Sequence, residues 1–234
     1  METIITALLH LDCELLLFFN GGNSVLIDVL MQALTSGLTW IPLYLALFYL
    51  VIRSNKSVGR IVAIVICAAL CVTLAGGVAD CFVKPLVMRC RPLNDPALSH
   101  VVRVIAGTSN DSYSFFSSHA ANTFSIALFF FLITQNRLLG TTLIFWSLLN
   151  CYTRVYLAMH YPSDVLAGLA WGTVVALLVY AVYSRTNKTI TLHDTAENKS
   201  SVPPTYKSSD AAVVFVVFLL TLLYALIRAV ITCS

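Results

Sequence analysis

Charged residues are scarce in this chain. Only 11% of its 234 residues are Asp, Glu, Lys or Arg, whereas 59% are hydrophobic, and a soluble domain averages roughly a quarter charged residues. The mean hydropathy is +0.86. This composition excludes an ordinary soluble domain and predicts an integral membrane protein. The formal net charge of +3 is too small to indicate a nucleic-acid partner.

Paired cysteine motifs are also missing, because the seven cysteines include no Cys-x-x-Cys. Cys67 and Cys71 have a spacing that suits two ligands on one helix face, but no second pair follows. Buried free cysteine is common, so we expect these thiols to be small hydrophobic side chains, with no metal and no cofactor. A disulfide between Cys81 and Cys90 stays open, since both are expected near one membrane face.

Basic residues are absent before Arg53, so the start of the chain lacks the basic region of a signal peptide. Residues 1–36 are apolar but carry scattered acids and the sequence Asn-Gly-Gly-Asn. We expect this N-terminal segment to form amphipathic helices at a membrane interface. A distorted additional span is the alternative.

Long apolar stretches dominate the rest of the chain, and a spanning helix needs about 20 such residues. The stretches are residues 37–52, 59–83, 114–134, 140–158, 162–183 and 211–232. The sequence therefore predicts an all-α fold, a polytopic transmembrane helical bundle with about six spans. Its parts are a core at 37–183, a polar cytoplasmic loop at 184–210 and a C-terminal span at 211–234.

Basic residues fall into two groups of loops. One group, which includes Arg53, Arg137 and Arg185, marks the cytoplasmic side by the positive-inside bias. The opposite group is Lys84, Arg89, Arg91, Arg103 and Arg154. These five residues need another explanation, because basic residues are disfavoured in exported loops.

Three short segments at that opposite side carry polar groups that suit a phosphate. They are KPLVMRCRP at residues 84–92, SFFSSH at 114–119 and TRVYLAMHYPSD at 153–164. With alternating spans, all three reach the same membrane face. Arginine suits bidentate contact with phosphate oxygens, and a helix start offers free N–H groups to an anion.

The two histidines in these segments suit nucleophilic and acid–base chemistry. Asp164 follows His160 by four residues at a helix start, so its carboxylate can hold one imidazole nitrogen and leave the other free to attack. His119 is placed to protonate a leaving oxygen. Each segment alone has a structural explanation, such as pairing of Asp80 with Lys84 one turn away or snorkelling of Arg154. Their conjunction on one face favours a site.

The combination resembles the three-part signature of the type 2 phosphatidic acid phosphatase and vanadium haloperoxidase superfamily, which reads K-x6-RP, PSGH and SR-x5-H-x3-D. Lys84 with Arg91-Pro92, the sequence FSSH at 116–119, and Arg154 with His160 and Asp164 match it. The departures from the signature are Phe116 for proline, Ser118 for glycine and Thr153 for serine. None of them removes a reacting group.

For phosphate binding, the resemblance implies roles for Lys84, Arg91 and Arg154, assisted by Ser117 and the backbone at Ser118. The three cations would supply the charge stabilisation that a metal otherwise gives. The implied enzyme is therefore a metal-independent lipid phosphatase.

For catalysis, the resemblance implies that His160 attacks phosphorus to give a phosphohistidine and that Asp164 orients it. His119 would act as general acid and then activate water.

The expected substrate is a membrane phospholipid or isoprenoid diphosphate at the periplasmic face of a bacterial-type inner (plasma) membrane. Undecaprenyl diphosphate is the first choice, and lipid A phosphate, phosphatidylglycerol phosphate and phosphatidate are the rivals that the motifs do not separate. Two other classes stay open: a vanadate-dependent haloperoxidase and a non-catalytic lipid-binding membrane protein.

Overall fold

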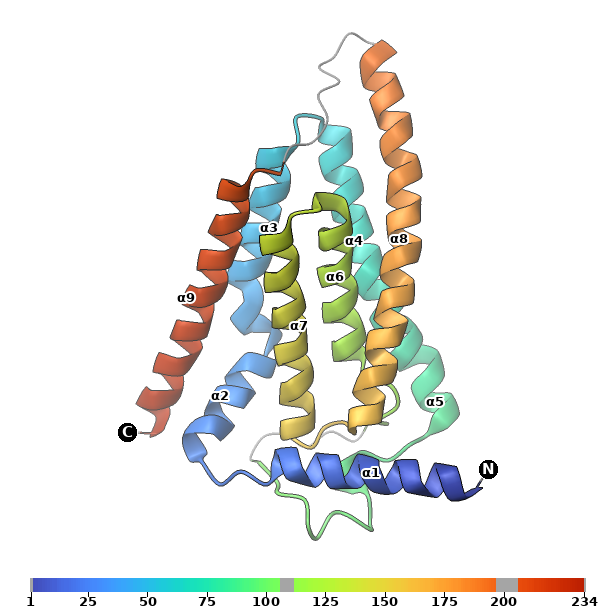
Figure 1. The fold of residues 1–234 in the computed structure, drawn as a ribbon, viewed down its shortest axis with the longest axis vertical. Coiled ribbons are helices and arrows are strands. Elements are labelled where there is room, and N and C mark those ends of the chain that lie inside the picture. The colour runs from blue at the N-terminus through green and yellow to red at the C-terminus, as the bar shows by residue number, and fades with distance from the viewer. Residues whose placement is uncertain (1, 106–111, 197–205, 234) are drawn as a thin grey trace.

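The computed structural model describes residues 2–105, 112–196 and 206–233, and all regular elements in these ranges are helical (Figure 1). The α-helices are α1 (Glu2–Asn20), α2 (Val25–Thr35), α3 (Ile41–Ser54), α4 (Val58–Val78), α5 (Lys84–Val87), α6 (Ser118–Thr134), α7 (Arg137–Tyr156), α8 (Pro162–Ala196) and α9 (Ser208–Cys233). The short elements are the 3-10 helices η1 (Gly37–Trp40) and η3 (Pro92–Asn94) and the π-helix η2 (Ala79–Val83).

Helix α6 lies at the centre of the bundle, where it packs against α4, α7 and α8. Helix α9 packs against α2, α3 and α7 on the other side. Figure 1 shows these helices running roughly side by side, whereas α1 lies across one end of the bundle.

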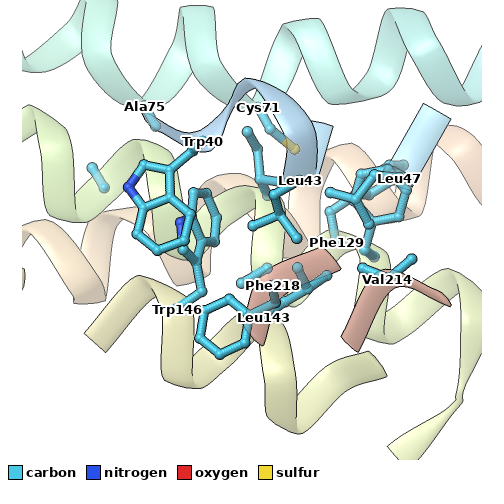
Figure 2. Packing of buried hydrophobic residues seen from close by; sticks show 14 of the residues in the cluster. Trp40, Leu43, Leu47, Cys71, Ala75, Phe129, Leu143, Trp146, Val214 and Phe218 are labelled. Carbon is cyan, nitrogen blue, oxygen red and sulfur yellow. The ribbon is translucent and has the colours of Figure 1, made fainter. Parts of the chain in front are cut away.

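Aromatic side chains join the two sides of the bundle (Figure 2). Trp40 packs edge-on against Trp146 of α7 at 5.9 Å between ring centroids and stacks on Phe218 of α9 at 6.0 Å. All three side chains are at most 3% exposed. Aromatic pairs in such arrangements contribute about 0.5–1.5 kcal/mol each beyond burial. Helix α9 therefore belongs to the same hydrophobic core as α7, which carries the start of the third motif.

Two glycines allow α8 to approach α6 closely. A Cβ atom on Gly168 would lie 2.6 Å from the Ser117 carbonyl oxygen, and one on Gly172 would lie 2.7 Å from that of Ala121. Small residues four apart let helix backbones meet in membrane bundles. This contact fixes the start of α6 against the start of α8, where the second and third motifs lie.

The polytopic all-helical architecture is confirmed, and helices occupy all six stretches that were expected to span. By length and composition, four candidates among the described residues suit a membrane span, or five if the bent pair α1–α2 is one span. The four are Gly37–Ser54, Val58–Asn94, Pro162–Leu192 and Ser208–Cys233. Helix α6 is apolar but shorter.

The N-terminal segment forms two helices that meet at 113°. Such a pair is either a broken span or a re-entrant loop by composition, so the interfacial interpretation stays a prediction.

One expected loop is partly wrong. Residues 184–196, assigned to the polar loop 184–210, continue helix α8. The polar side chains there are compatible with a helix: Thr189 donates to the Arg185 carbonyl, and Asn187 accepts from Arg60 Nε of α4 at 2.8 Å. Residues 197–205 lie outside the described part of the chain.

All seven cysteines are free, which excludes a disulfide between Cys81 and Cys90 in this structure. Cys67 and Cys71 are buried in α4. Within the described residues, no group of three or more His, Cys, Asp or Glu side chains is arranged to hold a metal.

Candidate active site

The three motifs meet at one end of the bundle around a cavity of about 540 Å³. Six of the eight residues expected from the sequence line it, and they are Lys84, Arg91, Ser118, His119, Arg154 and His160. Ser117 and Asp164 are fully buried behind this wall. Ser112 and Tyr113, from the loop between the first two motifs, also line the cavity.

The start of α6 is fixed by Ser117. Its side chain caps the helix by accepting from the Ala120 N–H, and its own N–H donates to the Asp164 carbonyl at 3.0 Å. The first N–H groups of a helix have no partner within it and point outward. The backbone at Ser118 and His119 therefore presents the positive end of the helix to the cavity.

Lys84 follows directly on the π-helix η2 and points into the cavity. Its ammonium group lies 2.6 Å from Asp80 and 3.3 Å from the Ser118 hydroxyl. The Asp80 side chain is 55% exposed and also lines the cavity. The pairing of Asp80 with Lys84 that the sequence suggested is therefore present. It does not remove Lys84 from the site, because both residues line the cavity.

Arg91 is held by neutral acceptors. Its guanidinium donates to the Ser112 carbonyl at 2.8 Å, to the Ser112 hydroxyl at 2.7 Å and to the Met159 carbonyl at 3.0 Å. These bonds orient the side chain without neutralising it.

Arg154, in the last turn of α7, is even less compensated. It is 6% exposed and donates from Nη1 to the Thr35 hydroxyl of α2 at 3.0 Å. Its Nε is buried and has no hydrogen-bond partner among the described residues. Buried polar groups are normally paired, so this guanidinium is suited to receive an anion.

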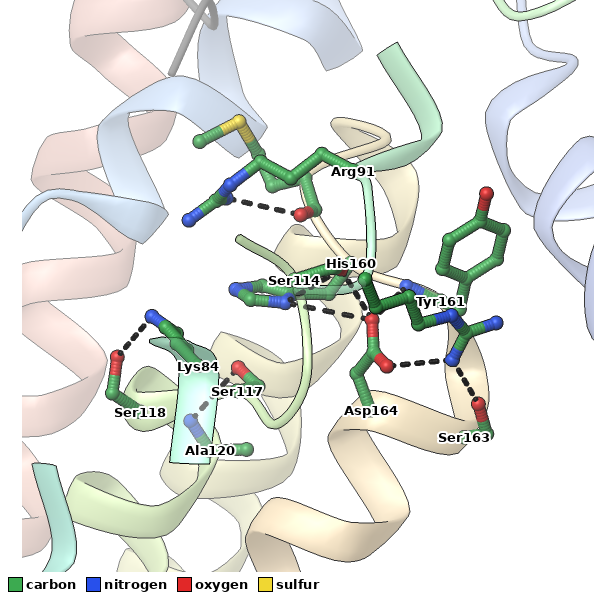
Figure 3. A network of polar contacts seen from close by, with 12 residues as sticks. Lys84, Arg91, Ser114, Ser117, Ser118, Ala120, His160, Tyr161, Ser163 and Asp164 are labelled. Carbon is green, nitrogen blue, oxygen red and sulfur yellow. Dashed lines mark hydrogen bonds and ion pairs between the residues drawn. The ribbon is translucent and has the colours of Figure 1, made fainter. Parts of the chain in front are cut away.

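His160 and Asp164 meet as the spacing predicted, but a third residue joins them (Figure 3). Asp164 Oδ2 lies 3.7 Å from His160 Nδ1. Ser114 donates a short hydrogen bond to Asp164 Oδ2, and its hydroxyl lies 3.4 Å from the same Nδ1. With Nδ1 turned to this pair, Nε2 is the ring nitrogen left for the cavity.

The protonation state of His160 suits a nucleophile. Burial holds the pKa of His160 below its usual value, and the nearby positive charges of Arg154 and Arg91 lower it further, against the opposing effect of Asp164. The imidazole is therefore neutral at neutral pH, with a lone pair available for attack.

Three residues of this network were missed from the sequence. Ser114 donates a hydrogen bond to the carboxylate of Asp164, and the guanidinium of Arg89 lies 2.7 Å from the carboxylates of both Asp164 and Asp12. Arg89 carried one signal, since it was among the basic residues at the disfavoured face. Arg103, another of those, pairs with Asp28 at 2.6 Å. Ser114 lay within the second segment but had no role assigned to it, and Asp12 carried no signal.

A polytopic helical membrane protein with this cation-lined histidine site has the features of a metal-independent phosphatase of the membrane type. A family model described as the PAP2 superfamily matches residues 63–188, and the chain belongs to that superfamily. It is a membrane lipid phosphatase, a hydrolase that acts on phosphoric esters.

Three named relatives indicate which lipid phosphatases this chain is similar to. The lipid A 4'-phosphatase of Bacteroides thetaiotaomicron is 34% identical over 76% of this chain and 80% of its own length. The lipid A 4'-phosphatase of Porphyromonas gingivalis is 31% identical over 75% of this chain and 74% of its own. The undecaprenyl-diphosphatase of Bacillus subtilis is 28% identical over 36% of this chain and 42% of its own. No solved structure matches the chain.

Proposed function

We propose that this phosphatase removes a phosphate monoester from a lipid A-type glycolipid. Undecaprenyl diphosphate was the first expectation, but the similarity favours its rival. The two lipid A 4'-phosphatases align with about three quarters of the chain, whereas the undecaprenyl-diphosphatase aligns with 36% of it. Phosphatidylglycerol phosphate and phosphatidate stay as further members of the test panel.

The observation that carries the proposal is the charge of the cavity. Lys84, Arg91 and Arg154 contribute three positive charges and Asp80 one negative charge, which leaves about two positive charges while His119 is unprotonated. A phosphate monoester carries about two negative charges at pH 7. A diphosphate brings additional negative charge, which would meet the Asp80 carboxylate.

The surroundings of the cavity suit a lipid. A second cavity of about 150 Å³ shares His119 with the first, and its lining combines the apolar or aromatic residues Trp40, Tyr44, Val72 and Ile126 with the polar residues Thr35, Asn122, Thr123 and Asn150. Tyr44 and Ile126 also line a third, almost wholly apolar cavity of about 180 Å³ between α3 and α4. A phosphate in the first cavity therefore has a mixed polar and apolar cavity beside it that adjoins an apolar one, which suits the sugar and acyl parts of a glycolipid.

The reaction has two steps. In the first, His160 Nε2 attacks phosphorus, the phosphorus–oxygen bond to the lipid breaks, and His119, protonated once the phosphate dianion offsets the nearby cations, gives its proton to the leaving oxygen. The three cations and the α6 N-terminus stabilise the charge on the phosphoryl oxygens. Asp164 and Ser114 hold Nδ1 of the attacking ring.

In the second step, His119 takes a proton from water, the water oxygen attacks phosphorus, and the bond to His160 breaks. Inorganic phosphate leaves, and both histidines return to their starting states. No step needs a metal, an oxidant or a reductant.

The test is phosphate release by the purified protein in detergent with EDTA. The panel is lipid A, undecaprenyl diphosphate, phosphatidylglycerol phosphate and phosphatidate, with His160→Ala as control. Lipid A should give the highest kcat/KM, and the variant should release none. Faster release from undecaprenyl diphosphate would reject the proposed substrate. If the wild type and His160→Ala bind the lipid equally and the wild type releases no phosphate, the chain would instead be a lipid-binding protein.

A further inference from the structure

Helix α1 brings a buried carboxylate to the surroundings of Asp164. Asp12 is 6% exposed, although α1 lies across the end of the bundle (Figure 1) and its Glu14 side chain is 63% exposed. Asp12 also lies outside residues 63–188, which the superfamily model matches. Its burial therefore needs an explanation in this chain.

Arg89 links Asp12 to Asp164. Its Nη2 lies 2.7 Å from Asp12 Oδ2, and its Nη1 lies 2.7 Å from Asp164 Oδ1. The guanidinium carbon also lies 3.8 Å from the centre of the Tyr161 ring, a cation–π distance. Charged hydrogen bonds of this kind are short and directional, so the position of Arg89 fixes the carboxylate oxygen that it binds.

Asp12 also holds the start of α8. Its Oδ1 accepts from the Ser163 N–H at 2.8 Å, and its Oδ2 accepts from the Ser163 hydroxyl at 2.5 Å. Pro162, the first residue of α8, has no N–H to offer. Asp12 thus acts as a cap supplied by another helix, and its charge suits the positive end of the helix dipole.

Both oxygens of Asp164 therefore accept hydrogen bonds. Oδ1 receives Arg89, and Oδ2 receives Ser114 and the Tyr161 N–H at 3.0 Å. The buried carboxylate can then face His160 in only one orientation. Arg89 and Asp12 do not line the catalytic cavity, so they act through Asp164 and not on the lipid.

We propose that Asp12 and Arg89 are positioning residues of the phosphatase: together they hold Asp164 in the orientation that aligns His160, and α1 is thereby part of the active site. This inference rests on the proposed function, because it assigns the two residues to the step that His160 performs. A loss of alignment affects the reacting geometry more than substrate binding.

The experiment compares Asp12→Asn with Glu14→Gln, a matched change two residues along the same helix at an exposed position. In detergent with lipid A, we expect Asp12→Asn to lower kcat by roughly 10- to 100-fold, with KM within about twofold. Glu14→Gln should keep both parameters. Asp12→Glu, which keeps the carboxylate, should recover part of the lost kcat.

Arg89→Lys provides a second route if Asp12→Asn does not fold. It keeps the charge but cannot hold two carboxylates with a planar fork, so kcat should fall in the same way. Thermal unfolding in detergent identifies the variants that are folded.

Wild-type kcat in folded Asp12→Asn or in folded Arg89→Lys would overturn the inference, as would a rise in KM at unchanged kcat. A wild-type protein that releases phosphate from no lipid would reject the proposed function first, and this inference with it.

Discussion

At the scale of single residues, the three cations of the site are compensated to different degrees, since Lys84 lies beside Asp80 whereas Arg91 is bonded to neutral acceptors. Arg154 is buried, and among the described residues its one side-chain hydrogen-bond partner is the Thr35 hydroxyl. Removing a charge from water without a counter-charge costs several kcal/mol, so a purely structural arginine here would be disfavoured. A phosphate that binds and leaves would account for a guanidinium without a counter-charge among the described residues, and this is the role that we propose for Arg154.

Asp80 is the residue that should influence which anion binds. Asp80→Asn removes the negative charge beside Lys84, so kcat/KM for a diphosphate should rise relative to that for a monoester. Because Asp80 is 55% exposed, water screens the effect, and we expect the ratio of kcat/KM for undecaprenyl diphosphate to that for lipid A to rise about two- to fivefold. A competition assay with both lipids measures it. An unchanged ratio, or the same rise in Glu14→Gln, would contradict this role.

At the scale of helices, the close contact between α6 and α8 sets the geometry of two motifs. Gly172→Ala places a methyl group against the Ala121 carbonyl, where a Cβ would lie 2.7 Å away. The helices must separate, at a cost of about 1–3 kcal/mol for overpacking. We expect a lower Tm in detergent together with a lower kcat.

The matched control for that substitution is Gly77→Ala. A Cβ atom on Gly77 of α4 meets nothing within 4 Å among the described residues. Alanine is favoured over glycine inside a helix by about 1 kcal/mol, so Tm should stay equal or rise, with activity kept. Equal losses in both variants would mean that the α6–α8 contact has no special role.

Sequence patterns predicted local features of these helices well and long-range contacts poorly. The lengths of the apolar runs predicted the six helical stretches. The four-residue spacing predicted that His160 and Asp164 lie close together, and their side chains are 3.7 Å apart. The continuation of α8 to Ala196 was missed because its polar residues lack the apolar pattern on which a span prediction depends. The link between Asp12 and Arg89 joins residues 77 positions apart, and no local pattern encodes such a contact.

At the scale of the whole molecule, the distribution of basic residues gives the bundle a direction. The α3–α4 turn at one end of the bundle holds Arg53 and Lys56, whereas the residues that line the candidate active-site cavity lie at the opposite end. By the positive-inside bias, an excess of basic residues outside the site is expected on the cytoplasmic side. We propose on this basis that the cavity faces the periplasm, where it can reach lipids of the outer leaflet of a bacterial inner membrane.

Cysteine labelling tests that direction. In a background without the native cysteines, Ser99→Cys probes the cavity end and Lys56→Cys the other end, and both positions are exposed. A membrane-impermeant maleimide added to spheroplasts should label Ser99→Cys at once and Lys56→Cys only after lysis. The reverse pattern would place the cavity in the cytoplasm, and the substrate would then have to be a lipid of the inner leaflet.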